Sequence, residues 1–374
     1  MRSNLSVAAS PRSRGGANIL IISRHDYRTA RRASVHFLAQ KMAEQGHRVS
    51  FLSIGYSWLS RLRGDSRAHL FDRANRWETV DGVRSYLWRS AWHPVKLPIP
   101  PAVAGWIYQL WANGPFPEFD ATAGEADVVI VESGIAPALL PRIRAAAPNA
   151  RIIYRATDLL ATAGVPSCIE DMLRANEGLI DLVVVVARTM LPHFGQFQCP
   201  KLFIPHGVDL QRLRLRTQSP YARPDNAVSV GSMLFDARAV QSLAAATPHF
   251  TFHVIGAPKG DFPANVIQYD EMSFERTLPY LQHADVGIAA YAPAQAAEYL
   301  SDSSLKLRQY AAIGLPSLCP DFAVGDHPLR FGYDPSQPAD IARAFAEATQ
   351  ARRTPVLAKD WNDIAEELVE AALG

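Results

Sequence analysis

The sequence predicts an α/β protein with two doubly wound parallel sheets facing a cleft. Its 374 residues allow two domains of ordinary size. Short β-branched segments alternate with helix-patterned segments along nearly the whole chain, which is typical of βαβ units. The alternation pauses at KLFIPHGVDLQRL (201–213) and the polar loop after it, which we interpret as the hinge between the domains.

The first half of the chain carries five apolar segments that we predict to be strands, at 18–24, 48–55, 127–133, 151–157 and 182–188. A helix is predicted after the first strand, ending at Gly46, because glycine often follows the last turn of a helix. WETVDGVRSYLWRS (77–90) predicts a β-hairpin that turns at Asp81-Gly82. HPVKLPIPPAVAGWIYQLW (93–111) is Pro-rich, then amphipathic with aromatics, and is predicted to contact a membrane.

The second half repeats the pattern, with strands predicted at 227–232, 250–256, 265–272, 285–292, 316–320 and 329–334. Helices are predicted at 277–284, around Lys306, at 340–352 and at 361–373. We therefore expect a disordered basic tail at 1–17, a first domain at 18–205 that faces acceptor and membrane, and a second domain at 206–374 that binds nucleotide.

The composition is that of a globular protein outside a bilayer, with 48% hydrophobic and 20% charged residues. No apolar run approaches the roughly 18 residues that span a membrane, and the N-terminus does not look like a secretory signal. Cys168, Cys199 and Cys319 lie far apart without metal-ligand spacing, which predicts buried thiols in a reducing compartment.

Positive charge and tryptophan are concentrated in residues 1–111. This stretch holds 17 Lys and Arg against 6 Asp and Glu, and six of the seven Trp. This mixture suits an anionic membrane surface. Nucleic acid is an alternative partner, although no nucleic-acid-binding motif supports it, and a plain core with a solvated basic face is another. The predicted membrane contacts are Arg28, Arg31, Arg32, Trp58, Arg61, Arg63, Trp106 and Trp111.

Several catalytic motifs are absent from the sequence. It has no GxGxxG after a strand, no P-loop, no GxSxG elbow and no HExxH. It also has no Asp-x-Asp pair, which weakens any model in which a metal bridges a diphosphate.

SDSSLKLRQYAAIGLPSL (301–318) predicts a phosphate site. Ser301, Asp302, Ser303 and Ser304 offer helix caps in a row, and Lys306 and Gln309 share one helix face near the positive end. Such a helix start binds anions, although a solvated face is the alternative reading.

These segments resemble motifs of the glycosyltransferases with two Rossmann-like domains, the GT-B architecture. The resemblance is carried by PHGVD (205–209), VGS (230–232), SSLKLRQY (303–310) and AIGLP (312–316). The run from Ala17 to Ser57, with ISRHDYRTARRASVHFLAQ, is similar to the membrane-associated glucuronosyltransferases of xanthan assembly.

The resemblance implies transfer of glucuronate from UDP-glucuronate to the terminal mannose of a polyprenyl-diphosphate-linked trisaccharide, with inversion and without a metal. It also implies peripheral attachment to the cytoplasmic face of the inner membrane, and a last helix (360–374) that returns to the first domain. Many retaining members carry two Glu where this chain has Ser301 and Gln309, so the inverting reading is favoured.

An inverting transfer needs a general base and stabilisation of the leaving diphosphate. We predict Asp158, at the end of a strand, as base, with helix capping as its alternative role and Glu132 as second choice. His25, Asp26 and Glu132 are predicted on the acceptor side. His206 lies in the hinge motif, where both a structural and a chemical role stay open. Lys306 is predicted to stabilise the leaving group, and the predicted donor-binding residues are Gly231, Ser232, Met233, Glu271, Met272, Tyr291, Ser303, Ser304 and Gln309.

Two other function classes stay open at this point. A nucleotide-sugar epimerase on the same frame would need no lipid acceptor and would leave the basic, Trp-rich stretch unexplained. A sugar-nucleotide or lipid-binding module would bind without turnover and would not depend on Asp158.

Overall fold

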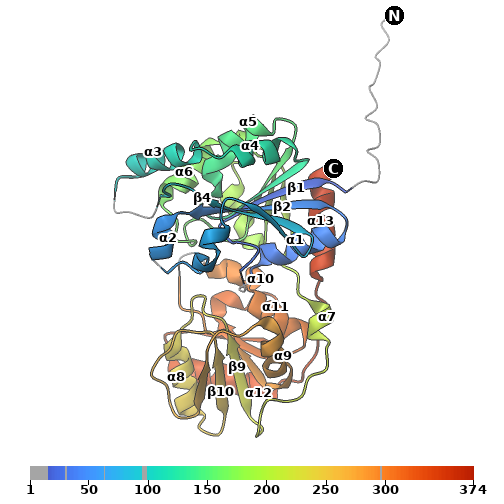
Figure 1. Cartoon of the computed structure of the whole chain (residues 1–374). Coiled ribbons are helices and arrows are strands. Elements are labelled where there is room, and N and C mark those ends of the chain that lie inside the picture. The colour runs from blue at the N-terminus through green and yellow to red at the C-terminus, as the bar shows by residue number, and fades with distance from the viewer. Residues whose placement is uncertain (1–15, 30–31, 63, 95–98, 295–296) are drawn as a thin grey trace, which may run out of the picture.

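The structure, a computed structural model, describes residues 16–29, 32–62, 64–94, 99–294 and 297–374. It contains two α/β domains, drawn one above the other in Figure 1. Most of the predicted tail, together with Arg31 and Arg63, lies outside the described residues.

The first domain is built on an eight-stranded sheet in the order β3-β4-β2-β1-β5-β6-β7-β8. Every pairing is parallel except the β3–β4 hairpin, whose Asp81 (φ 49°) and Gly82 (φ 77°) form the predicted turn. The strands are β1 (Asn18–Ser23), β2 (Arg48–Tyr56), β3 (Trp77–Val80), β4 (Val83–Arg89), β5 (Val128–Glu132), β6 (Arg151–Ala156), β7 (Leu182–Val185) and β8 (Lys201–Phe203).

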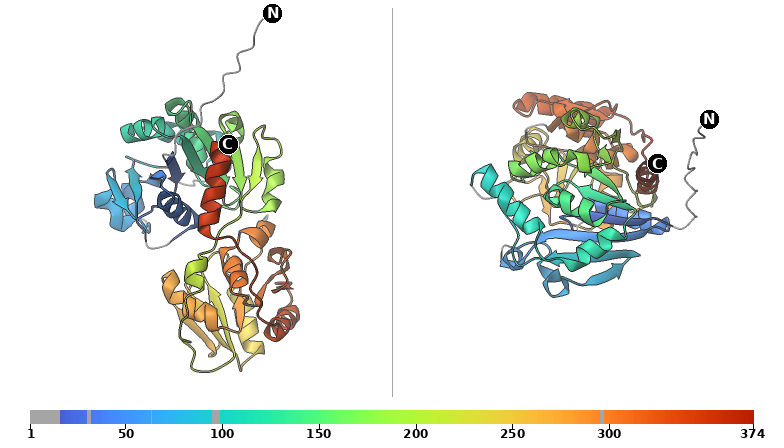
Figure 2. Two further views of the ribbon diagram at one scale, coloured as in Figure 1. Left: turned by 90° about the vertical axis from the view of Figure 1, so that its right-hand side faces the viewer. Right: turned by 90° about the horizontal axis from the view of Figure 1, so that it is seen from above.

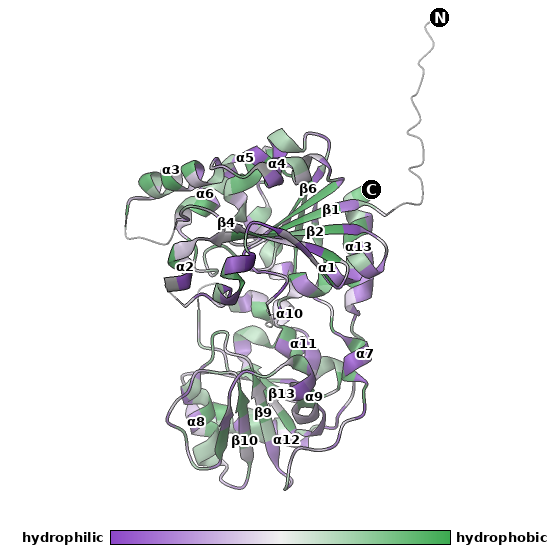
Figure 3. Cartoon of the chain, in the orientation of Figure 1, coloured by the Kyte–Doolittle hydropathy of each residue, from purple (hydrophilic) through white to green (hydrophobic). Residues whose placement is uncertain are grey.

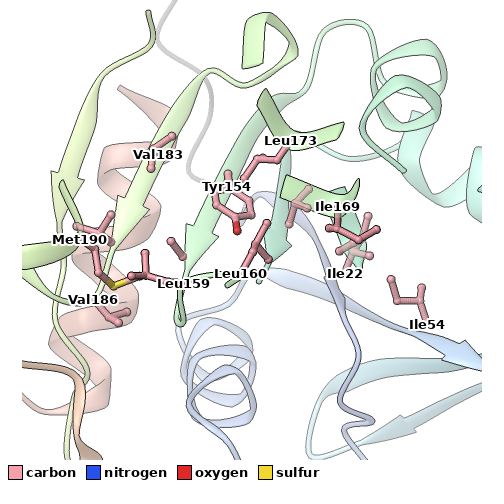
Figure 4. Close-up of a cluster of buried hydrophobic side chains, with 14 of the residues drawn as sticks. Ile22, Ile54, Tyr154, Leu159, Leu160, Ile169, Leu173, Val183, Val186 and Met190 are labelled. Atoms are coloured by element: carbon pink, nitrogen blue, oxygen red, sulfur yellow. The ribbon is translucent and has the colours of Figure 1, made fainter. Parts of the chain in front are cut away.

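Helices cover both faces of this sheet, which explains why its strands are continuous apolar runs. Ile19 and Ile21 of β1 pack toward α1 and α13, whereas Leu20 and Ile22 pack toward the opposite layer. Figure 4 shows part of that opposite core, where side chains from β1, β2, β6, β7 and α6 meet. The helices are α1 (Ser34–Glu44), α2 (Trp58–Leu62), α3 (Pro101–Ala112), α4 (Pro117–Gly124), α5 (Leu140–Ala146) and α6 (Ser167–Ala175).

The second domain has a six-stranded parallel sheet in the order β11-β10-β9-β12-β13-β14. Helices α8 and α12 pack on one face, and α9 and α11 on the other. The strands are β9 (Asn226–Val230), β10 (Thr251–Ile255), β11 (Val266–Tyr269), β12 (Val286–Ile288), β13 (Ser317–Pro320) and β14 (Arg330–Tyr333). The helices are α7 (Leu210–Leu213), α8 (Ala237–Ala246), α9 (Phe274–His283), α10 (Leu300–Ser303), α11 (Leu305–Ala312) and α12 (Pro338–Gln350).

The last helix, α13 (Trp361–Leu373), lies against the first domain beside α1, as Figure 2 shows. The ring of Trp361 stacks on Phe37 with 5.3 Å between centroids. Gly207 permits this crossing, because a Cβ at that position would lie 2.8 Å from backbone atoms of Trp361. The chain therefore passes between the domains twice, and the two passes are bonded where the Val208 amide donates to the Lys359 carbonyl (3.1 Å).

Candidate active site

The candidate site lies where the carboxyl ends of the two sheets meet, which is the position at which α/β sheets bind ligands. The first domain contributes the loops after β1, β5 and β6, and the second contributes the loops after β9 and β12 and the α10–α11 junction. We call these six segments the interdomain site. A surface cavity of about 610 Å³ lies elsewhere, along α7 and residues 353–358, and holds none of the predicted residues.

Asp158 lies at this site on a loop held by Ser133. The Ser133 hydroxyl accepts from the Asp158 amide (3.2 Å) and donates to the Asp158 carbonyl (2.9 Å). Oδ1 of the Asp158 carboxylate accepts a hydrogen bond from the hydroxyl of Tyr299 (3.1 Å), a residue of the other domain. Burial raises the pKa of Asp158, and Tyr299, Arg155 and Arg24 partly oppose that rise.

Helix capping does not account for Asp158. The next α-helix, α6, begins at Ser167 and has Pro166 at its N-cap position. The carboxyl is instead a partly desolvated group between the domains, as a general base requires.

Glu132, the second-choice base, lies inside the first domain. Its carboxylate pairs with the Arg155 guanidinium (2.7 Å) and accepts from the Ser23 hydroxyl (3.0 Å). Both members of the pair are buried, and Arg155 also contacts Nδ1 of His206 (3.3 Å). The prediction that Glu132 faces the acceptor is therefore wrong, because its carboxylate is enclosed as the counterion of a buried arginine. Of the two roles left open for His206, its burial favours the structural one.

The two residues predicted on the acceptor side after β1 differ in burial. Asp26 is fully buried and paired with Arg28 (2.9 Å), which contradicts its predicted role. Burial alone would raise the pKa of Asp26, but the hydrogen bonds and charge of Arg28 hold it below its ordinary value. His25 is exposed at the end of the strand, so its prediction stays open.

Lys306 lies in the first turn of α11. Among the residues that the structure describes, its buried ammonium Nζ has no hydrogen-bond partner. Nζ lies 5.2 Å from the ring centroid of Tyr291, and burial lowers the pKa of Lys306 to about 8. An ammonium held away from water without a counterion is well placed to receive an anion.

Ser304 and Tyr291 shape the start of the same helix. The Ser304 hydroxyl accepts from the Leu307 amide (3.2 Å) as the N-cap and lies 2.5 Å from the Tyr291 hydroxyl. Tyr291 is only 2% exposed, so it does not face the donor as predicted. It contacts Ser304 and Lys306 from the interior of the domain. Ser303, the last residue of α10, is also buried.

The other predicted donor residues lie on loops of the second domain, except Gln309, which lies on α11 itself. Gly231 (φ 92°) has open space where a side chain would be, so a ligand can approach its backbone closely. Its amide already donates to the Ile255 carbonyl (2.8 Å) and is therefore not a donor for the diphosphate. Met233 is 47% exposed on the same loop, after Ser232. Glu271 is exposed, and Met272 and Gln309 are half-buried.

The predicted membrane contacts divide by burial. Trp111 (2% exposed) packs in the core and the Arg28 side chain (2%) pairs with Asp26, so both predictions are wrong. Trp58 and Trp106 are exposed, and Arg61 lies over the Phe71 ring. Arg32 pairs with Asp81 (3.6 Å) and lies over the Tyr27 ring.

Helix α3 presents an apolar outer face. Val103, Trp106 and Leu110 recur at helical spacing and are 46%, 59% and 47% exposed. The hydropathy colouring of Figure 3 shows this helix at the edge of the first domain.

The described residues lack two features, a metal cluster and a membrane-spanning helix. They contain no group of three or more His, Cys, Asp or Glu side chains that is placed to hold a metal ion. No helix within them has the length and apolar content to cross a bilayer.

The sequence did not identify Tyr299 or Arg24 as site residues. Tyr299 lies in the 3₁₀ turn η5 (Ala297–Tyr299), outside every motif, and only the packing of the two domains brings it to Asp158. Arg24 follows β1 directly, next to His25, and its position at a strand end was the available signal.

Solved structures show the fold. A sucrose-phosphate synthase from Thermosynechococcus elongatus matches with a TM-score of 0.60 at 14% identity, over 96% of this chain and 95% of that chain. A trehalose-phosphate synthase from Burkholderia xenovorans matches with a TM-score of 0.62 at 11% identity, over 96% and 100%. At these identities the likeness confirms the predicted GT-B fold and nothing more.

Sequence comparison shows the family. Residues 21–186 match the model of the N-terminal domain of glucuronosyltransferase GumK. The chain is also 37% identical, over 94% of its length and 89% of the relative, to the UDP-glucuronate:glycolipid 2-beta-glucuronosyltransferase of Xanthomonas campestris pv. campestris. The chain therefore belongs to the GumK family of glucuronosyltransferases.

Proposed function

We propose that this enzyme transfers glucuronate from UDP-glucuronate to the terminal mannose of a polyprenyl-diphosphate-linked oligosaccharide, forming a β-linkage in the repeat unit of a xanthan-type exopolysaccharide. The related Xanthomonas enzyme is named for such a donor and a glycolipid acceptor. The observation that carries the proposal is that two groups share the interdomain site: Asp158, a carboxyl with a raised pKa, and the ammonium of Lys306, which has no hydrogen-bond partner among the residues described.

In the proposed step, the acceptor hydroxyl oxygen attacks the anomeric carbon on the face opposite UDP. Asp158 takes the hydroxyl proton as the new carbon–oxygen bond forms, and its raised pKa makes it a stronger base. The bond between the anomeric carbon and the β-phosphate oxygen breaks, and UDP departs with that electron pair. Inversion follows from attack and departure on opposite faces.

Lys306 and the first amides of α11 would hold the negative charge that develops on the departing diphosphate. A lysine ammonium binds phosphate as a point charge, and a helix N-terminus adds partial positive charge. We propose that these groups act without a metal ion. Activity that survives EDTA is the expected result, and loss of activity restored by Mg²⁺ would contradict it.

The test of the proposed reaction is incorporation of label from UDP-[14C]glucuronate into solvent-extractable glycolipid, using membranes that contain the acceptor. Wild type is compared with Asp158→Asn and with Asp171→Asn, a matched change at an exposed position on α6. We expect label with wild type and Asp171→Asn, and loss with Asp158→Asn while UDP binding persists.

Other outcomes separate the remaining readings. Equal label from wild type and Asp158→Asn would remove Asp158 as the base. Label from another UDP-sugar but not from UDP-glucuronate would keep the fold and reject the donor. UDP-glucuronate binding without any transfer would favour a non-catalytic binding protein.

We also propose peripheral attachment to the cytoplasmic face of the inner membrane through the exposed face of α3 and through Trp58. Indole and aliphatic side chains at helical spacing bury into the headgroup region, and neighbouring arginines favour anionic lipid. The double variant Trp106→Ser/Leu110→Ser is expected to lose flotation with anionic vesicles while keeping its unfolding midpoint. Unchanged flotation would show that the membrane contact does not depend on this face of α3.

A further inference from the structure

We propose that Arg24 binds the carboxylate of the transferred uronic acid and thereby sets the preference for a charged donor sugar. The inference rests on the proposed function, because it names the residue that would distinguish UDP-glucuronate from a neutral UDP-sugar. The argument has three parts: the position of Arg24, the state of its guanidinium, and the charges that the donor carries.

The position of Arg24 is set by the sheet. It follows Ser23, the last residue of β1, and β1 lies beside β5, which in turn lies beside β6. Because these strands are parallel and in register, the residues after them meet at one edge. Arg24 therefore lies on the same edge as Asp158. Its charge opposes the rise in the pKa of Asp158 and also lowers the pKa of Asp65.

The backbone at Arg24 is fixed. Its carbonyl accepts a hydrogen bond from Nη1 of Arg67 (2.8 Å), and Arg67 is itself paired with Asp65 (2.8 Å). The side-chain stem lies along the loop after β5, because a Cβ built on Gly134 would be 3.7 Å from Cδ of Arg24. A fixed base and a supported stem reduce the conformational entropy that the side chain would lose on binding a ligand.

The guanidinium itself is available. Across the described ranges of the chain, no hydrogen bond or ion pair engages it, and Arg24 is an exposed residue. Several other arginines of this domain are paired with carboxylates, including Arg28 with Asp26 and Arg155 with Glu132. Among the described residues, Arg24 thus differs from these arginines in having no ion pair or hydrogen bond at its guanidinium, and its charge acts on both Asp158 and Asp65.

UDP-glucuronate carries two separate anionic groups, the diphosphate and the sugar carboxylate. Lys306 and the start of α11, on the second domain, suit the diphosphate. The carboxylate is part of the sugar being transferred, so it must lie close to the reacting carbon and hence to the base. An arginine fork matches a carboxylate in two parallel hydrogen bonds. Arg24 follows β1 at the same end of the sheet as Asp158 follows β6, and no ion pair within the described residues competes for its guanidinium.

An anionic group of the acceptor is the rival ligand. In a glycolipid, however, the intervening sugars separate the lipid phosphate from the hydroxyl that reacts. A cation at the same end of the sheet as Asp158 is therefore better placed for the donor carboxylate than for the lipid phosphate.

The test measures kcat/KM for UDP-glucuronate and for UDP-glucose with wild type, Arg24→Gln, Arg24→Lys and Arg84→Gln. Arg84 is an exposed arginine near the start of β4, at the opposite edge of the sheet, so its variant is the charge-matched control. Charge-assisted hydrogen bonds predict a loss of about 10- to 100-fold for Arg24→Gln with UDP-glucuronate and little change with UDP-glucose. Arg24→Lys should restore part of the loss, and Arg84→Gln should match wild type.

Calorimetric binding of UDP-glucuronate and of UDP, without acceptor, gives a second readout that does not need turnover. Arg24→Gln should weaken the binding of UDP-glucuronate and leave the affinity for UDP unchanged. Equal losses for both donors, a raised acceptor KM alone, or unchanged selectivity would overturn the inference. If wild type binds UDP-glucuronate in an Arg24-dependent way but transfers nothing, the proposed function fails while this inference stands.

Discussion

Replacing Lys306 with methionine should separate stability from ligand binding. Lys306 keeps a buried ammonium without a partner among the described residues, and its pKa falls from 10.5 to about 8. Since one pKa unit corresponds to about 1.4 kcal/mol, the charged lysine destabilises the unliganded fold by about 3 kcal/mol at neutral pH. Methionine retains the unbranched stem and removes the charge.

The sign of the pH dependence follows from the lowered pKa. Below about pH 8 the lysine is protonated in both the folded and the unfolded chain, so the full destabilisation is present. Between about 8 and 10.5 the unfolded chain binds more protons, and the free energy of unfolding of wild type rises with pH. Lys306→Met should be more stable than wild type at pH 7, and this advantage should disappear as pH approaches 10.5.

Binding should change in the opposite direction. Loss of a charged hydrogen-bond donor predicts a Kd for UDP about 10- to 100-fold higher in Lys306→Met. Urea unfolding at several pH values and calorimetric titration with UDP measure the two effects. Lys359→Met is the control, because that ammonium is exposed and pairs with Glu367 (2.6 Å) at the surface. A Lys306→Met protein that binds UDP normally, or is less stable at pH 7, would refute the reasoning.

Three further changes test the interdomain site and its support. Tyr299→Phe removes a hydrogen bond that favours the ionised carboxyl of Asp158, so the acidic limb of the kcat/KM profile should move to higher pH; an unmoved limb would exclude this coupling. Glu132→Gln leaves the Arg155 charge buried without a counterion and should lower the free energy of unfolding by about 3–5 kcal/mol in urea. Trp361→Ala removes the contact of α13 with Phe37 and should lower the free energy of unfolding by about 3–5 kcal/mol. A loss below about 1 kcal/mol would show that the helix is not firmly docked.

The sequence predicted the fold well because its signals are local. Apolar runs flanked by polar loops located the strands to within a few residues, and Asp81-Gly82 located the hairpin because few residues adopt positive φ readily. The lysine helix was found from its serine cap and the glycine that ends it.

The site was harder to predict because burial and pairing depend on tertiary packing. Arg28 and Trp111 have the residue types of membrane contacts, yet one pairs with Asp26 and the other fills the core. Glu132 ends a strand as Asp158 follows one, but Arg155 on the next strand encloses the first carboxylate and leaves the second facing Tyr299. No sequence pattern places Tyr299 opposite Asp158, since these residues belong to different domains.

The configuration of the newly formed glycosidic bond tests the central claim most directly. Product glycolipid made from UDP-glucuronate, whose sugar is α-linked to UDP, would be released from its lipid and its anomeric proton coupling measured by NMR. Our account predicts a β-linked glucuronate, formed by wild type and absent from Asp158→Asn. An α-linked product would contradict a single inverting displacement with Asp158 as its base.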